Sequence, residues 1–181
     1  MIIQSQKCIA QSHTIKFFVV PFLYVNTLSL TYEYSFNIHN SIGVHNNVTL
    51  INGFIGSYTT IGSSIYYRYY INFKNKKHRF YFQPEVRYYR LSTIEYESDL
   101  QDPLRSDNYT LGFLIGPNTY FGKSRHMFFE FGIGLNAGPR KYVGDGRWAI
   151  RESDGSHYFN KNPDDKFSIV PRVVLEIGYR F

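Results

Sequence analysis

The residues best suited to carry chemistry are carboxylates and basic side chains that recur at alternating positions along the chain. Each has apolar or aromatic neighbours on both sides, so in an extended strand the charges share one face. Such a set could form a proton or ion path, an acid–base pair, or a structural network of ion pairs. We take the structural network as the default, because an unpaired buried charge is costly. The set comprises Glu33, Arg68, Glu85, Arg87, Glu130, Arg172, Glu176 and Arg180, with Lys16 added if the first strand keeps its alternation.

A second candidate is the pair Ser156 and His157 in the segment "ESDGSHYF". A serine nucleophile and its histidine base must lie within hydrogen-bond reach. Nothing in the sequence fixes that geometry, so we predict no catalytic residue. The same region carries several aspartates, but their spacing matches no EF-hand and no calcium-binding repeat. We therefore predict no metal site and no cofactor. These aspartates are Asp145, Asp154, Asp164 and Asp165.

The composition excludes several classes of protein. Aromatic residues make up 19% of the 181 residues, and the formal net charge is +6. The basic residues are scattered, and no nucleic-acid-binding motif accompanies them, so we predict no nucleic-acid partner. The single cysteine, Cys8, excludes an internal disulfide. Residues 1–13 are interpreted as an N-terminal segment and a possible signal-peptide remnant, because "CIAQS" has the small residues of a cleavage site.

Alternation with a period of two dominates the rest of the chain and predicts half-buried strands. The weakest of these patterns is the first, and Asn26 would be the tight turn that follows it. Asn46 interrupts the apolar face of the third. Helix-period patterns are absent. The predicted strands cover residues 14–25, 27–36, 41–51, 57–71, 79–91, 108–121, 127–138 and 167–181.

The connections between these strands also follow a pattern. Those at 37–40, 72–78 and 122–126 are short, whereas 92–107 and 139–166 are long. Strands of this length can cross a bilayer at a tilt. We therefore predict an all-β fold over residues 14–181. It is an eight-stranded antiparallel up-and-down transmembrane β-barrel with short periplasmic turns and longer extracellular loops. The residues expected to face lipid include Tyr67, Tyr69, Phe82, Phe113, Phe131 and Leu175.

The last strand is the most specific segment, because "LEIGYRF" alternates apolar residues up to a terminal aromatic. With "LSLTYEY" and "FEFGIGLNAG", it resembles the small outer-membrane β-barrel proteins of Gram-negative bacteria, of the OmpA and OmpX type. The resemblance implies an outer-membrane location with both termini in the periplasm. It also implies that the barrel-assembly machinery reads the last strand as an assembly signal, carried by Leu175, Ile177, Tyr179 and Phe181.

The function expected from this reading is structural or binding, with a polar lumen plugged by the charged set. The protein would act through its extracellular loops or as a subunit of an envelope complex. The loop 92–107, with a net charge of 1 − 5 = −4, could bridge to lipopolysaccharide through divalent ions. Both long loops could contact a protein partner. A possible contact patch comprises Tyr142, Trp148, His157 and Tyr158.

Two alternatives remain open at this point. The same barrel could be an enzyme that hydrolyses or transfers acyl chains of lipid A, using residues near Ser156 and His157. A soluble ligand-binding barrel is the other alternative, and it would require an inward aromatic face and a charged exterior.

Overall fold

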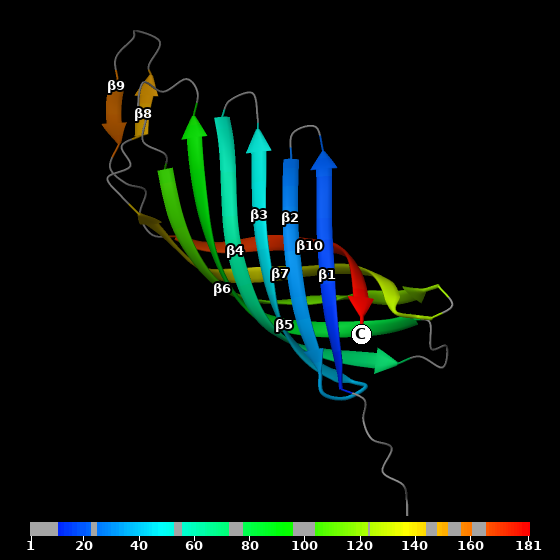
Figure 1. The fold of residues 1–181 in the computed structure, drawn as a ribbon. Coiled ribbons are helices and arrows are strands. Elements are labelled where there is room, and N and C mark those ends of the chain that lie inside the picture. The colour runs from blue at the N-terminus through cyan, green and yellow to red at the C-terminus, as the bar shows by residue number, and fades with distance from the viewer. Residues whose placement is uncertain are drawn as a thin grey trace, which may run out of the picture.

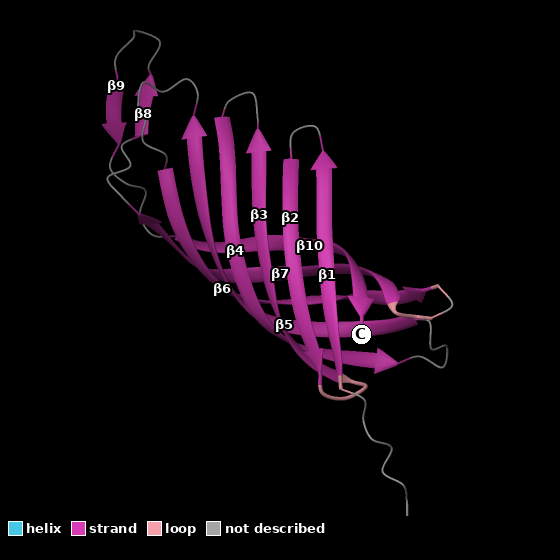
Figure 2. Ribbon diagram, viewed as in Figure 1, coloured by secondary structure: helices cyan, strands magenta, loops and turns pink. Residues whose placement is uncertain are grey.

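The computed structural model describes residues 11–22, 25–52, 56–72, 78–95, 104–122, 124–143, 148–151, 157–160 and 166–181. All regular structure in these ranges is β-strand (Figure 2). Among the described residues there is no helix long and apolar enough to cross a membrane. The strands are β1 (Ser12–Phe22), β2 (Val25–Ser35), β3 (Asn40–Asn52), β4 (Gly56–Asn72), β5 (His78–Glu95), β6 (Leu104–Phe121), β7 (Met127–Val143), β8 (Trp148–Arg151), β9 (His157–Asn160) and β10 (Lys166–Arg180).

Eight of these strands form a closed barrel in the order β1-β10-β7-β6-β5-β4-β3-β2 (Figure 1). Each strand pairs antiparallel with its neighbours, and β1 closes the ring against β10 with Phe17 opposite Ile177. This seam pairs Thr14–Phe17 with Ile177–Arg180, so the ring closes at the turn-end part of these two strands. The predicted eight-stranded antiparallel barrel is therefore confirmed.

The two ends of the barrel differ. At the turn end lie the connections at 36–39 and 122–126, the start of β1 and the end of β10. At the loop end lie the ends of β5 and β7 and the starts of β6 and β10, and the hairpin β8–β9 lies between β7 and β10 in the sequence. This hairpin forms its own two-stranded sheet outside the ring (Figure 1), and the sequence reading did not predict it.

Several strand boundaries differ from the prediction. The turn predicted at Asn26 is wrong, because Asn26 lies within β2 opposite Pro21. The first strand instead begins at Ser12 and ends at Phe22. It therefore includes the last two residues of the predicted N-terminal segment 1–13. Residues 1–10, on which the predicted signal-peptide remnant falls, lie outside the described residues.

Strands also extend into the predicted loops. Residues 92–95 belong to β5, residues 104–107 to β6, and residues 139–143 to β7. Hydrogen bonding of the backbone can continue past the apolar part of a strand, whatever the side chains are. The polar side chains that suggested loops therefore do not mark the strand ends.

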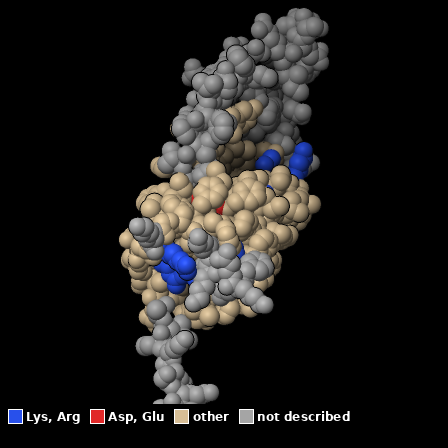
Figure 3. Space-filling model, turned by 90° about the vertical axis from the view of Figure 1, so that its right-hand side faces the viewer, with Lys and Arg blue, Asp and Glu red and all other residues tan. Residues whose placement is uncertain are grey.

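The side chains alternate between the outside and the lumen as the sequence predicted. The six residues expected to face outward are 36–45% exposed. On the face shown in Figure 3, uncharged residues cover most of the described surface, and Lys and Arg gather in separate patches. The exterior is thus largely apolar, which is the reverse of a soluble barrel.

Aromatic side chains fill much of the lumen as well. Tyr66 and Phe128 are 2% and 1% exposed, and each lies against the glycine paired with it on the neighbouring strand. A Cβ atom at Gly43 would come within 2.4 Å of the Tyr66 ring, and one at Gly178 within 2.1 Å of the Phe128 ring. Small residues opposite large ones allow side chains to fill a narrow barrel.

A boundary of the apolar exterior is visible on β5 and β6. Tyr88 and Tyr109 form an outward aromatic pair with ring centroids 5.1 Å apart. One outward position nearer the loop end, Arg90 forms an ion pair with Asp107 (Nε–Oδ1 2.8 Å). Aromatic residues next to charged ones are typical of the edge of a membrane-spanning band.

Candidate functional site: the lumen charge network

The middle of the lumen contains a cluster of four charged side chains, one from each of four strands. This central cluster consists of Lys16 on β1, Glu33 on β2, Arg68 on β4 and Glu130 on β7. None is more than 2% exposed. Alternation places all four inward, and barrel closure brings them together although Lys16 and Glu130 are 114 residues apart in sequence.

Each cation of the central cluster contacts both carboxylates. The Nζ atom of Lys16 lies 2.7 Å from Glu33 and 2.9 Å from Glu130. The Nη1 atom of Arg68 lies 3.0 Å from Glu33 and 2.7 Å from Glu130, while its Nη2 atom donates to the second oxygen of Glu130. Two positive and two negative charges therefore balance within the cluster.

Neutral side chains satisfy the remaining atoms of the cluster. Glu33 accepts hydrogen bonds from Ser41, Tyr66 and Tyr70. Glu130 accepts one from Asn118. Arg68 donates to Gln83 and stacks on the Tyr81 ring, with its Cζ atom 4.1 Å from the centroid. All four carboxylate oxygens have partners, so the arrangement suits a fixed structural network better than a group that must bind and release protons.

A second group lies nearer the loop end. Arg172 donates from Nη1 to Glu85, and Asn136 donates to the same Glu85 oxygen at 3.0 Å. Glu176 accepts from Thr31 at 2.7 Å and lies 3.2 Å from Nδ1 of His45. The sequence spacing had indicated that Arg172 and Glu176 would find partners on other strands, and each does so in the structure.

Two of the eight predicted residues lie in the lumen without a carboxylate partner among the described residues. Arg87 is half-buried and donates from Nη2 to Asn47 at 3.1 Å. Arg180 lies at the turn end and donates to Ser12 and Tyr120. The structure thus brings six of the eight predicted residues into two groups and leaves Arg87 and Arg180 outside them.

Sequence reasoning had listed Lys16 conditionally and had assigned no role to the tyrosines that point into the lumen. The alternation of β1 is weak, so its register could not be read with certainty, yet Lys16 lies at the centre of the cluster. Tyr66 and Tyr70 occupy the inward positions on either side of Arg68. Their period-two spacing from Arg68 was the signal that could have identified them.

The predicted assembly residues Leu175, Ile177, Tyr179 and Phe181 all point outward and are 36–58% exposed. Phe181 exchanges two backbone hydrogen bonds with His13 on β1 (3.1 and 2.9 Å). Its ring stacks with the His13 ring, with centroids 5.9 Å apart. The last residue of the chain therefore takes part in the seam that closes the barrel.

The possible loop contact patch is divided between two elements. Three of its members belong to the hairpin β8–β9, where Trp148 is opposite Asn160, Tyr158 opposite Ile150 and His157 opposite Arg151. Tyr142 instead lies on β7, opposite Ser106 on β6. Ser156 and all four candidate calcium ligands fall outside the described residues. The described residues contain no group of three or more metal-ligating side chains.

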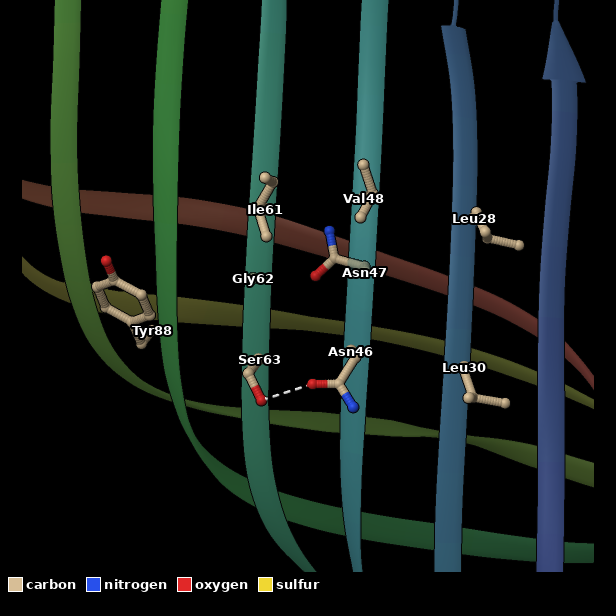
Figure 4. Close-up of a pocket in the computed structure, with 9 residues that line it drawn as sticks. All are labelled: Leu28, Leu30, Asn46, Asn47, Val48, Ile61, Gly62, Ser63 and Tyr88. Carbon is tan, nitrogen blue, oxygen red and sulfur yellow. Dashed lines mark hydrogen bonds between the residues drawn. The ribbon is translucent and has the colours of Figure 1, made fainter.

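A polar pair interrupts the apolar exterior on β3 and β4. The Ser63 hydroxyl donates to Asn46 Oδ1 at 2.8 Å, between outward aliphatic residues of both strands. The pair forms the floor of a notch of about 300 Å³ whose sides include Leu28, Ile61 and Tyr88 (Figure 4). The sequence had marked Asn46 as the residue that breaks this face.

This notch gives a test of which face meets lipid. Replacing both partners, as in Asn46→Leu with Ser63→Ala, should raise the free energy of unfolding in lipid vesicles by about 1 kcal/mol. The reason is that an amide in an apolar medium costs ~1–3 kcal/mol, which its hydrogen bond only partly offsets. Denaturant unfolding of the refolded protein in vesicles measures the change.

The neighbouring residue provides a matched control. Asn47 points into the lumen and accepts from Arg87, so Asn47→Leu should lower the free energy of unfolding by ~1–3 kcal/mol. The assignment of the faces would be contradicted if the outward double variant lost stability while Asn47→Leu kept the free energy of unfolding of the wild type.

Comparison with known proteins yields structural relatives alone. No protein-family model matches the chain, and no curated protein matches it. Among crystal structures, the N-terminal β-barrel domain of Pseudomonas aeruginosa OprF is 13% identical with a TM-score of 0.52, covering 94% of this chain and 97% of that one. Neisserial surface protein A is 12% identical with a TM-score of 0.54 and coverages of 94% and 92%. Outer membrane protein OprG from Pseudomonas aeruginosa is 13% identical with a TM-score of 0.53 and coverages of 94% and 93%.

These similarities extend over nearly the whole of each chain. At 12–13% identity they show that the protein has the fold of eight-stranded outer-membrane barrels. The resemblance inferred from the last strand is thereby confirmed at the level of fold.

Proposed function

We propose that the protein is an integral outer-membrane barrel with a closed polar lumen, which acts through its loop end or as a subunit of an envelope complex. The observation that carries the proposal is the contrast between the two faces of one closed sheet. The exterior is largely apolar, while the lumen holds balanced, hydrogen-bonded charges.

The apolar exterior supports a membrane location. Only helices and closed barrels satisfy every backbone hydrogen bond within lipid, and this chain forms a closed barrel. In water, the outward aromatic and aliphatic residues would form a patch far larger than soluble monomers expose. The fold shared with outer-membrane barrels supports the outer membrane in particular. Termini at the turn end are then periplasmic, and the hairpin β8–β9 is extracellular.

The central cluster supports a closed lumen. Its four charges meet across the barrel, and Tyr66, Tyr70, Tyr81 and Phe128 fill the space around them. An eight-stranded barrel is just wide enough for its interior to be filled by side chains. A structural or binding role follows more naturally from such a lumen than a role as a diffusion pore.

The loop end is the proposed contact surface, and lipopolysaccharide and a protein partner remain the proposed ligands. Part of the predicted acidic loop is strand, and its Asp107 is already paired with Arg90. The contribution of 92–107 to a divalent-ion bridge would therefore rest on Glu95, Glu97, Asp99 and Asp102. No observation on the described residues favours the lipid-A-modifying enzyme. The apolar exterior of this protein disfavours the soluble ligand-binding barrel.

Phe181 provides the experiment on outer-membrane assembly. The protein would be exported behind a bacterial signal sequence, and the folded band in the outer-membrane fraction would be measured by its heat-modifiable migration. Phe181→Asp should lose most of that band, because the resemblance implies that the terminal aromatic is read by the assembly machinery. Phe181→Tyr should retain it.

A second measurement separates assembly from stability. Phe181 is 58% exposed, so purified Phe181→Asp should refold in detergent micelles nearly as well as the wild type. Normal outer-membrane yield of Phe181→Asp would contradict the proposed assembly route. Equal failure in cells and in micelles would show instead that the residue acts by closing the barrel.

A further inference from the structure

A polar cavity of about 260 Å³ lies in the lumen, on the loop-end side of the central cluster, between β2, β3, β5 and β10. Its polar lining includes Ser29, His45, Asn47, Arg87, Arg172 and Glu176. Its volume is far above the ~10–15 Å³ that one water molecule requires. The central cluster separates it from the turn end.

The charges around this cavity are unevenly paired. Arg172 is paired with Glu85, and Glu176 is engaged by Thr31 and His45. Arg87 has no carboxylate within ion-pair distance among the described residues, and its Nε atom is buried without a hydrogen-bond partner. The Arg87 guanidinium therefore has no counter-charge in direct contact, which is unfavourable for a half-buried ion.

A second lining group is also unsatisfied. Ser29 is 3% exposed, and its hydroxyl has no hydrogen-bond partner among the described residues. Further toward the loop end, the next inward charge on β7 is again a cation, Arg140, which donates to Asn108. Arg87 and Arg140 thus both place positive charge on this side of the lumen, which favours the approach of an anion.

We propose that this cavity binds a small oxyanion, with a carboxylate or phosphate group held by Arg87. A guanidinium presents parallel N–H donors that match the oxygens of such groups. The free Nε donor of Arg87 supplies one contact, and the Ser29 hydroxyl supplies a neutral donor on the facing side of the cavity. The anion places a counter-charge in direct contact with Arg87, while the Arg172–Glu85 ion pair and the hydrogen bonds of Glu176 stay in place.

The test uses the full chain, refolded in a sugar-based detergent that contains no phosphate or carboxylate. Sodium phosphate and sodium acetate are titrated in separate arms, and sodium chloride keeps the ionic strength constant. The arginine Nε–Hε signals are followed by ¹H–¹⁵N NMR in ¹⁵N-labelled protein. The Arg87 signal should shift to saturation in at least one arm. The signal of Arg180, a lumen arginine at the turn end, should not shift.

Variants give an independent readout. Arg87→Met should abolish the saturable response and should unfold at the same or a higher temperature than the wild type without anion, since it removes a half-buried charge that no carboxylate contacts. The wild type alone should gain thermal stability when the bound anion is added. Ser29→Val should weaken binding by several-fold while leaving the Arg87 signal responsive.

Three outcomes would overturn the proposal. In the first, the Arg87 signal does not respond in either arm. In the second, all arginine signals drift together without saturation, which would indicate a general salt effect. In the third, Arg87→Met lowers the unfolding temperature and the anions stabilise it as much as the wild type. That result would show that Arg87 stabilises the fold and that water, not an anion, solvates its guanidinium.

Discussion

Replacing Glu130 by alanine should lower the free energy of unfolding by about 3–5 kcal/mol, and by less if water reaches the site. Glu130 is 0% exposed and accepts from Lys16, Arg68 and Asn118. Its removal leaves two buried cations to share Glu33 alone. Reversible denaturant unfolding in lipid vesicles, monitored by circular dichroism, measures the loss.

A second substitution tests whether charge balance is the cause. Adding Lys16→Met to Glu130→Ala leaves Arg68 and Glu33 as a balanced pair, so the double variant should recover part of the lost stability. Additive losses would instead indicate that packing dominates.

Asp107→Ala is the matched control, because it breaks a carboxylate–arginine pair whose Arg90 is 49% exposed. Such exposed pairs contribute about 0–1 kcal/mol, and an equal effect at Glu130 would contradict a buried network.

An arginine placed on the exterior should destabilise the barrel according to its position along the strand. Ile65 lies near the middle of β4, points outward and is 66% exposed. Ile65→Arg should cost about 2–4 kcal/mol in vesicles, because lipid cannot solvate a guanidinium at the bilayer centre. Unfolding in vesicles, compared with the wild type, gives the value.

Phe167 provides the control at the edge of the same face. It is the second residue of β10, at the loop end, and is 71% exposed. Phe167→Arg should cost about 0–1 kcal/mol, as expected near the interface. If water surrounded the barrel, both exposed sites would accept arginine within ±0.5 kcal/mol. Equal small effects at the two sites would therefore contradict the membrane location.

Much of the fold could be predicted from the sequence, because a strand that separates two environments must alternate. Tyr67, Arg68 and Tyr69 show this directly, since a single shift in register would bring the arginine to the outside. The same logic placed Glu33, Glu85, Glu130 and Glu176 in the lumen. Alternation is a local property, so it can be read without knowledge of the three-dimensional structure.

Strand ends and partners could not be predicted in the same way. Asn26 resembles a turn residue, yet it lies within β2, opposite Pro21 of β1. The pairing of Lys16 with Glu130 depends on the closure of β1 onto β10 and on the relative shift of distant strands. No local pattern contains that shift. The isolation of Arg87 is likewise visible only when all inward residues are placed together.

The most direct test of a closed membrane barrel is the ion conductance of the purified protein in planar bilayers, with insertion verified in vesicles of the same lipid by heat-modifiable migration and resistance to protease. We predict negligible conductance from protein that is inserted and folded, because the proposed closed lumen is blocked at the central cluster of Lys16, Glu33, Arg68 and Glu130. A steady conductance of porin size from the same preparation would contradict the closed lumen and would assign the inward charges to an ion pathway.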